Sequence, residues 1–442
     1  MTRQDQAPRR MAAAKPNTFF GGAAILAMGI LVVKVIGLFY KIPLVNIIGS
    51  EGSADFNNAY NIYSVLLTIS TAGLPVAVSK MVSEANALGR QNQVHKVFRL
   101  SLAAFLTLGV VSFLIMYFGS EQLAGMMHDS LAAAGIRALA PAVICVGCLS
   151  AFRGYAQGHG NMTPTAVSQI LEALCKLVIG LGLAYWLVRA GQPSHVAAAG
   201  AITGVTVGTI LALAYMIFNF VSTRMREEKD TQDAPDSARR ILSTLMKIAI
   251  PITISSSMVG IVTVIDTSLV QGQLQRALLE NQDTWNLYGN FVDFTSLEEA
   301  LSAWQAALPD GSTVSMSLLD QYAAQAEALR DQQSALTDLQ SASLELHAAL
   351  ENISRTLYGN YSGAINISNL PTSLMAAITA SVIPAVSGGL ARRDRKGAAR
   401  ISGSALRITA LLSFPMGIGL FVLGTPIVRL LFASLNAELA GS

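Results

Sequence analysis

Nine long apolar segments fill most of the chain, and few folds can accommodate them. They lie near 18–46, 58–83, 98–118, 131–152, 164–188, 195–221, 242–270, 357–389 and 403–433. Each is long enough to cross a bilayer as a helix, which takes about 20 apolar residues. Because only helices and closed barrels satisfy their backbone in hydrocarbon, the pattern predicts an all-α integral membrane protein. Only 13% of the 442 residues are charged, whereas a soluble protein averages about a quarter.

The basic residues between these segments predict the orientation. They lie in the tail 1–17, near 90–99, at Arg153, in the linker 222–241 and at 392–400, which all fall on one side of the membrane. The short loops of the other side carry acidic residues such as Glu51 and Glu121. The positive-inside rule therefore predicts a multi-pass membrane protein with a cytoplasmic N-terminus. The first apolar run is too long for a cleaved signal and is expected to be an anchor.

Residues 272–356 interrupt the series of apolar segments. They carry three basic and twelve acidic side chains, a net charge of −9, and contain no run that could span a membrane. The predicted topology makes this block extracytoplasmic. Five leucines, the first at Leu329, and Ile353 fall at heptad spacing and predict a helical hairpin or a short coiled coil. Two interpretations stay open: a passive insertion, or a docking module for a partner protein.

A weak internal repeat predicts two related lobes. AYNIYSVLLTIS (59–70) aligns with LYGNYSGAINIS (357–368), so that Tyr60 and Tyr63 match Tyr358 and Tyr361. Parallel repeats of six helices are a known transporter architecture. We therefore expect an N-lobe of six membrane helices at 18–221, a cytoplasmic linker at 222–241, a seventh helix at 242–271, and the eighth and ninth at 357–442. The second lobe is expected to be incomplete, as in a fragment or a truncated product.

Two lysines in the first apolar segment suggest an anionic substrate. Lys34 and Lys41 are seven residues apart and so share one face of a helix. A cation within hydrocarbon is costly and usually faces a wet cavity or a partner, although Lys41 is near enough to the end to snorkel. We predict that both lysines line a substrate cavity, with Asp55 facing them and Asn61 on a polar wall.

Three further charges are candidates for ion coupling. Glu172 and Lys176 are four residues apart, a spacing that predicts a helical ion pair. The pair is either structural or contains a protonatable acid that is coupled to transport. Asp266 could neutralise a lysine or bind a coupling cation, and Arg153 is expected to be an interfacial anchor.

Enzyme signatures are missing from the sequence. There is no HExxH, GxSxG, P-loop or GxGxxG pattern and no paired zinc motif. We therefore expect no catalytic residues, no cofactor, no metal site and no nucleic-acid partner.

Three stretches carry a family resemblance. FRGYAQGHGNMTPTAVSQILEALCKLVIG (152–180), KVIGLFYKIPL (34–44) and GLPVAVSKMVSEANALGR (73–90) resemble the SpoVB/MurJ-type branch of the polysaccharide flippases. That branch belongs to the superfamily that includes the multidrug and toxic-compound extruders. The resemblance implies two six-helix lobes in a V, and translocation of an undecaprenyl-linked cell-wall precursor, such as lipid II, across the bacterial plasma membrane.

The same resemblance assigns roles to individual residues. It implies that Lys34 and Lys41 take the places of the family's first-helix cations, and Asp55 that of the acid that opens the second helix. The deeper acid of MurJ-type members has no counterpart in Ile69–Ala72, and the seventh helix offers Asp266 in place of a cavity arginine. These departures favour a SpoVB-like member.

Other functions remain as alternatives. A multidrug or cation antiporter of the same fold would prefer a deep carboxylate to Lys34. A docking protein would use 272–356 to bind a cell-wall or sporulation protein, and the membrane part mainly as an anchor. A membrane glycosyltransferase would need an outer acidic cluster with metal-binding spacing, which the sequence lacks.

Overall fold

The computed structural model describes residues 17–224, 233–281, 283–309, 312–331, 335–391 and 394–441. Every regular element within these ranges is a helix. Seven of the described helices are long and apolar enough to cross a membrane. The chain is therefore an all-α, multi-pass membrane protein, as the apolar segments predict.

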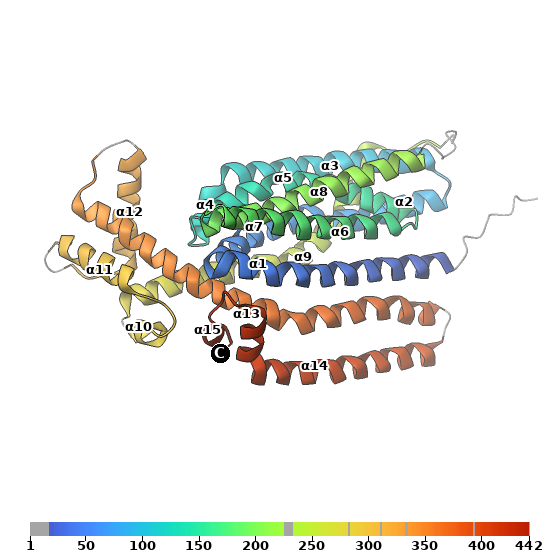
Figure 1. The fold of residues 1–442 in the computed structure, drawn as a ribbon. Coiled ribbons are helices and arrows are strands. Elements are labelled where there is room, and N and C mark those ends of the chain that lie inside the picture. The colour runs from blue at the N-terminus through green and yellow to red at the C-terminus, as the bar shows by residue number, and fades with distance from the viewer. Residues whose placement is uncertain are drawn as a thin grey trace, which may run out of the picture.

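The first part of the chain forms a tight bundle around one helix, α5 (Figure 1). Small residues on α5 let its neighbours approach closely: a side chain at Gly154 would clash with the backbone of Pro75. The bundle comprises α1 (Asn17–Thr71), α2 (Leu74–Ala87), α3 (Gln91–Phe118), α4 (Ser120–Met126), α5 (Ala132–Gly158), α6 (Thr163–Cys175), the π-helical η1 (Lys176–Gly180), α7 (Leu181–Arg189) and α8 (Ser194–Arg224).

Glycines lie at the two breaks that determine the course of the chain through α1 and α2. Gly49 has a φ of 72° and breaks α1, a left-handed conformation that glycine adopts without steric cost. The chain then runs back toward the end at which α1 begins, and α2 lies there (Figure 1). At Gly73 a Cβ would collide with the carbonyl oxygen of Ala249, so α9 (Ala238–Glu280) packs directly on the second break. The predicted span 58–83 thus comprises the second arm of α1 and most of α2.

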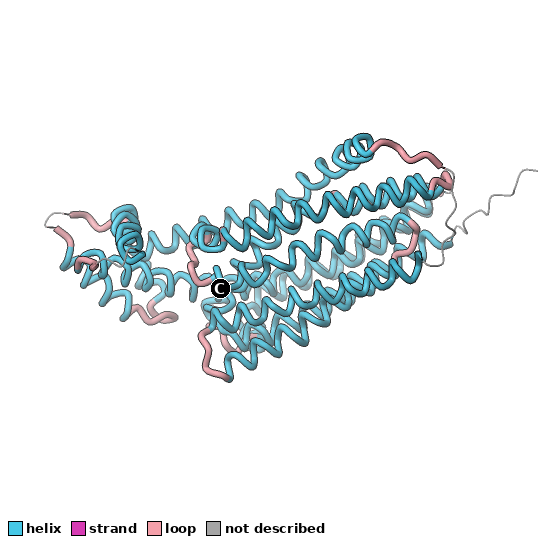
Figure 2. Tube along the Cα trace, turned by 90° about the horizontal axis from the view of Figure 1, so that it is seen from above, coloured by secondary structure: helices cyan, strands magenta, loops and turns pink. Residues whose placement is uncertain are grey.

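The remaining helices form the second part of the membrane bundle and the insertion. The insertion extends from the end of the bundle opposite to the turn between α2 and α3 (Figures 1 and 2). These helices are α9 (Ala238–Glu280), α10 (Asp283–Tyr288), α11 (Thr295–Ala307), α12 (Met316–Asp331), α13 (Asp338–Ala391), α14 (Arg395–Leu431) and α15 (Ala437–Gly441).

Two long helices connect the insertion to the membrane bundle without a break. The predicted boundary 271/272 falls inside α9, and the boundary 356/357 falls inside α13. Leu278 of α9 and Leu350 of α13 belong to the insertion's core, so both helices enter it without a linker. The insertion is therefore rigidly continuous with two of the helices that lie in the bundle.

The insertion has a hydrophobic core of its own, centred on Trp304 of α11. Leu346, Leu350 and Ile353 of α13 contribute to it, as the heptad spacing suggests. The single heptad frame is wrong, however, because α12 ends at Asp331 and α13 begins at Asp338. Leu329 therefore belongs to a different helix from Leu346, and the fold is a packed group of short helices on α13.

Several predictions fall partly outside the described residues. The tail 1–17 is described only from Asn17, the linker 222–241 lacks 225–232, and the basic pair at 392–393 is also outside the description. The predicted span 357–389 lies in α13 but is not among the seven apolar helices. The two-lobe repeat stays a prediction.

Candidate functional site

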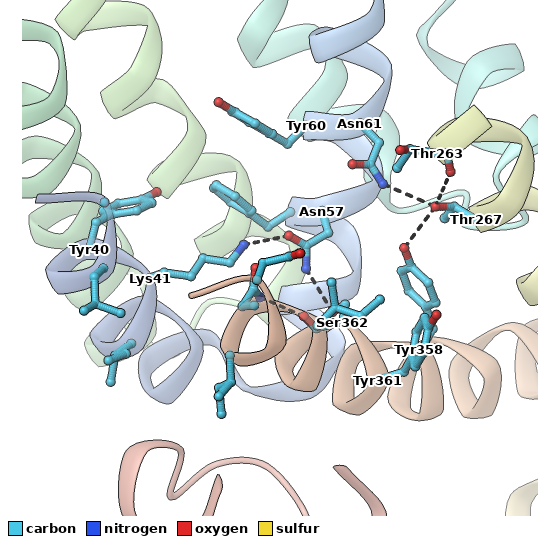
Figure 3. Close-up of a pocket in the computed structure, with 18 of the residues that line it drawn as sticks. Tyr40, Lys41, Asn57, Tyr60, Asn61, Thr263, Thr267, Tyr358, Tyr361 and Ser362 are labelled. Carbon is cyan, nitrogen blue, oxygen red and sulfur yellow. Dashed lines mark hydrogen bonds between the residues drawn. The ribbon is translucent and has the colours of Figure 1, made fainter. Parts of the chain in front are cut away.

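A cavity of about 570 Å³ lies between the N-lobe helices and the second part of the bundle. Both arms of α1 line it, together with η1, α9 and α13, and Leu431 of α14 completes the wall. Figure 3 shows polar side chains from α1, α9 and α13 converging on this space. The predicted site residues Lys34, Lys41, Asn61, Lys176 and Asp266 all line the cavity.

Lys41 is held by a polar chain that crosses the cavity. Its Nζ donates a hydrogen bond of 2.6 Å to Oδ1 of Asn57 and lies 4.6 Å from the ring centroid of Phe56. The Nδ2 of Asn57 in turn donates to Oγ of Ser362 on α13, at 2.9 Å (Figure 3). The cation of the first helix is therefore coupled to the opposite wall of the cavity through one amide.

The ammonium group of Lys176 makes cation–π contacts with three aromatic rings. Its Nζ is 4.7 Å from the ring centroids of both Tyr40 and Tyr60 and 5.9 Å from that of Phe56. Among the described residues it forms no ion pair. The helix is π-helical from Lys176 to Gly180, and π-helical turns interrupt the regular side-chain register and are frequent at functional sites. The expected pair of Glu172 with Lys176 is therefore wrong.

Glu172 instead pairs with Arg153 of α5. The Arg153 Nη2 lies 3.1 Å from Oε2 of Glu172, and its Nε donates to Oγ of Ser168 at 3.0 Å. The guanidinium side chain is 14% exposed, so Arg153 is not the interfacial anchor that its place in the sequence suggests. The pair lines a second cavity of about 350 Å³, which shares Lys34, Tyr40, Tyr60 and Lys176 with the first.

Hydroxyl groups of α9 and α13 form a cluster on one wall of the cavity. Oγ1 of Thr267 accepts hydrogen bonds from Nδ2 of Asn61 at 3.4 Å and from the hydroxyl of Tyr358 at 3.2 Å (Figure 3). Asn61 thus lies on the polar wall for which it was predicted. Asp266, one residue earlier on α9, lines the cavity with no salt bridge to any described residue.

Asp55 does not face the lysines, and its predicted place in the cavity is wrong. Its carboxylate is buried and accepts two hydrogen bonds from Arg355 of α13. The neighbouring Phe56 and Asn57 line the cavity instead. Arg355 is 300 positions away from Asp55 in the sequence. The spacing of residues along the second arm of α1 therefore does not indicate this partner.

Sequence reasoning missed the aromatic lining of the cavity. Phe56 and Tyr60 are stacked, with centroids 5.9 Å apart, and Tyr358 and Tyr361 lie on the opposite wall. The signal was present in the repeat, which aligns Tyr60 and Tyr63 with Tyr358 and Tyr361. Tyr60 is also four residues after Phe56, a spacing that places both rings on one helical face.

The comparison with known families decides the classification. A family described as "Polysaccharide biosynthesis protein" matches residues 19–277, more than half of the chain, and a related family of the same description matches 351–439. The chain belongs to the polysaccharide biosynthesis protein family. The two matches leave out residues 278–350, which form most of the insertion.

Two curated relatives identify the branch of this family. The chain is 31% identical over 192 residues to the "Lipid II flippase MurJ" of Bacillus subtilis (strain 168), covering 41% of this chain and 35% of the relative. It is 28% identical over 240 residues to the "Stage V sporulation protein B" of the same organism, covering 54% and 46%. This polysaccharide biosynthesis family member is thus of the MurJ/SpoVB type, and the matches span half or less of either relative.

Solved structures confirm the fold class. The inward-facing conformation of a multidrug resistance MATE family transporter of the MOP superfamily superposes with a TM-score of 0.57 at 13% identity. The superposition covers 95% of this chain and 78% of that one. The polysaccharide biosynthesis family member therefore has the MOP transporter fold.

Proposed function

We propose that this protein is a flippase that moves an undecaprenyl-pyrophosphate-linked saccharide across the bacterial plasma membrane by alternating access. The substrate class is that of lipid II or a related polysaccharide unit. In this proposal the N-terminus is cytoplasmic and the insertion is extracytoplasmic, as the basic residues between the helices predict.

One observation carries the proposal: two lysine ammonium groups lie at one aromatic-lined chamber, and neither has a carboxylate partner within the part of the chain that the structure describes. Nζ of Lys41 and Nζ of Lys176 are 4.6 Å and 5.9 Å from the same Phe56 ring. Hydrogen bonds from ammonium groups to phosphate are charge-assisted and stronger than neutral ones. Two adjacent ammonium groups therefore complement the two phosphates of a pyrophosphate.

The charge balance of the cavity supports an anionic headgroup. Among the described lining residues, three are lysines (Lys34, Lys41 and Lys176) and one carries a carboxylate (Asp266). An anionic sugar–pyrophosphate head cannot enter hydrocarbon unless its hydration is replaced, and these cations and the amide and hydroxyl groups beside them replace it. The polyprenyl tail needs no such replacement and can remain in the bilayer.

A multidrug or cation antiporter is the second candidate. Asp266 favours it, because a lone carboxylate in an aromatic cavity suits an organic cation. The three lysines disfavour it, since each would repel that cation. Asp266→Asn separates the two: it should abolish cation export under the antiporter proposal and leave saccharide transport largely intact under ours.

Growth of cells depleted of their lipid II flippase tests the proposal. The chain should restore growth, and Lys41→Gln or Lys176→Gln should remove that rescue at equal membrane abundance. Lys247→Gln is the matched control, because Lys247 is an exposed lysine of α9 outside the cavity lining. Failure of the parent chain to restore growth, or equal growth of all three variants, would contradict the proposal.

A further inference from the structure

A buried polar cluster lies one helical turn beyond the cavity, toward the insertion. On α9 it begins at Gln271, four residues after the cavity residue Thr267, and on α13 it ends at Arg355, three residues before Tyr358. No member is more than 9% exposed. The members are Asp55 and Asn58 of α1, Asp129 between α4 and α5, Gln271 and Gln275 of α9, and Glu351, Ser354 and Arg355 of α13.

Arg355 is the centre of this cluster. Its Nε and Nη2 donate parallel hydrogen bonds of 2.8 Å and 2.7 Å to the two carboxylate oxygens of Asp55. Its Nε also lies 3.3 Å from Oδ1 of Asp129. One guanidinium thus serves two carboxylates, which would repel each other at close range if it withdrew.

Amide groups extend the cluster to α9. Asn58 donates to Oδ2 of Asp129 at 2.7 Å and exchanges hydrogen bonds with the side-chain amide of Gln271. Nε2 of Gln275 donates to Oγ of Ser354 at 3.0 Å. The cluster therefore links α1, α9 and α13, which are three of the elements that line the cavity.

A second carboxylate fixes α13 to the loop between α4 and α5. Oε1 of Glu351 accepts hydrogen bonds from the backbone N–H of Ser130 at 2.6 Å and from its hydroxyl at 2.8 Å. Glu351 and Arg355 are four residues apart and so lie on one face of α13. That face is held by the first part of the bundle at two successive turns.

The insertion is positioned to control this face. Leu346 and Leu350 belong to the insertion's core and precede Arg355 on the same uninterrupted helix. A helix transmits displacement of one end to the other, because its hydrogen-bonded turns resist bending unless a kink is present. A force on the insertion would therefore move Arg355 relative to Asp55.

We propose that the Arg355 cluster is a latch that closes the cavity on the insertion side, and that the insertion sets its state through α13. The proposal rests on the proposed alternating access, because a latch requires two states. A buried ion pair suits this role. Both partners regain their hydration when the lobes separate, so opening the whole pair costs little free energy. Loss of one partner alone leaves an unpaired charge in the closed state.

Accessibility of a cavity cysteine to a membrane-impermeant maleimide, applied to intact cells, tests the latch. Thr263→Cys on α9 reports from the cavity lining, in a chain whose Cys145, Cys148 and Cys175 are replaced by alanine. Arg355→Gln should raise the rate of modification about tenfold, since it disfavours the closed state. Arg355→Lys keeps the charge without the parallel hydrogen bonds and should give an intermediate rate.

Arg276→Gln is the matched control. Arg276 also lies toward the insertion end, but its pair with Glu280 is at the surface, where the arginine side chain is 59% exposed. Its rate should equal that of the parent. An unchanged rate in Arg355→Gln, or an equal increase in both variants, would overturn the latch.

Two further measurements keep the test decisive. If Arg355→Gln does not accumulate in the membrane, Asp55→Asn replaces it, and an unchanged rate in Asp55→Asn would refute the latch. Modification of Ser312→Cys, an exposed position of the insertion, shows that the reagent meets the insertion side, and absence of that modification would also refute an outward-facing latch. Neither readout requires substrate, so failure of the latch is distinguishable from failure of the proposed function.

Discussion

Nζ of Lys176 lies 4.7 Å from the ring centroid of Tyr60. A cation–π contact contributes about 0.5–2 kcal/mol, depending on desolvation. A charge-assisted hydrogen bond to phosphate is stronger than this cation–π contact. The ring therefore positions the ammonium group, and a phosphate ligand can still bind it. The π-helical turn and the tyrosine together thus leave a positive charge available to a ligand inside the membrane bundle.

The pair of Arg153 with Glu172 should be structural. The two side chains are 14% and 26% exposed, so removal of one partner leaves a poorly hydrated charge. Glu172→Gln should lower the free energy of unfolding by about 1–3 kcal/mol, less than a fully buried pair would lose because solvent screens part of it. Thermal unfolding of the purified protein in detergent measures the effect.

A double variant and a surface pair are the controls for that experiment. Arg153→Met combined with Glu172→Met removes both charges and should recover most of the loss. Glu84→Gln breaks the surface pair with Lys80, whose side chains are 59% and 64% exposed, and should change the stability by no more than about 0.5 kcal/mol. A double variant less stable than Glu172→Gln would contradict the structural role.

Gly359 should be intolerant of any side chain. A Cβ at this position would meet the carbonyl oxygen of Ser50, where α13 crosses α1. Gly359→Ala should therefore cost about 1–3 kcal/mol through overpacking, or force the two helices apart. Gly403→Ala on α14 is the control, because an added Cβ there has open space around it. Equal thermal stability of the two variants would show that the crossing is loose.

The sequence predicts the parts of this molecule that depend on local pattern. Apolar length locates the membrane helices, and the net charge of 272–356 separates the insertion from them. The seven-residue spacing correctly places Lys34 and Lys41 together in one cavity lining. Each of these features depends on residues within a few helical turns, where periodicity is informative.

The features that sequence reasoning missed depend on distant partners or on local irregularity. Four-residue spacing favours a pair of Glu172 with Lys176, but Arg153 on α5 supplies a guanidinium that accounts for Glu172. The partner of Asp55 is Arg355, on a helix that begins inside the insertion, at Asp338. No periodicity within one helix carries information about which face of another helix it meets.

Trp304 should hold the insertion together through its ring and not through its indole N–H. Its side chain is fully buried, and its Nε1 has no hydrogen-bond acceptor among the described residues. Trp304→Ala should cost the insertion about 3–5 kcal/mol, whereas Trp304→Phe should be close to neutral because it removes an unsatisfied donor. Limited proteolysis within 272–356 measures the difference.

An exposed tryptophan provides the control for the proteolysis. Trp186 of α7 is 64% exposed, and Trp186→Ala should leave the cleavage rate of the insertion unchanged. Rapid cleavage of Trp304→Phe, comparable to that of Trp304→Ala, would instead show that the N–H has a partner.

Binding of a pyrophosphate-bearing lipid tests the central claim most directly. Equilibrium titration of the detergent-solubilised protein compares undecaprenyl pyrophosphate with undecaprenyl alcohol at one salt concentration. We expect the pyrophosphate to bind more tightly than the alcohol, and Lys176→Gln to weaken its binding about tenfold or more by removing a charge-assisted contact. Lys247→Gln should bind as the parent does. Equal affinity for the two lipids, or unchanged pyrophosphate affinity in Lys176→Gln, would contradict an anion site at the aromatic-lined lysines.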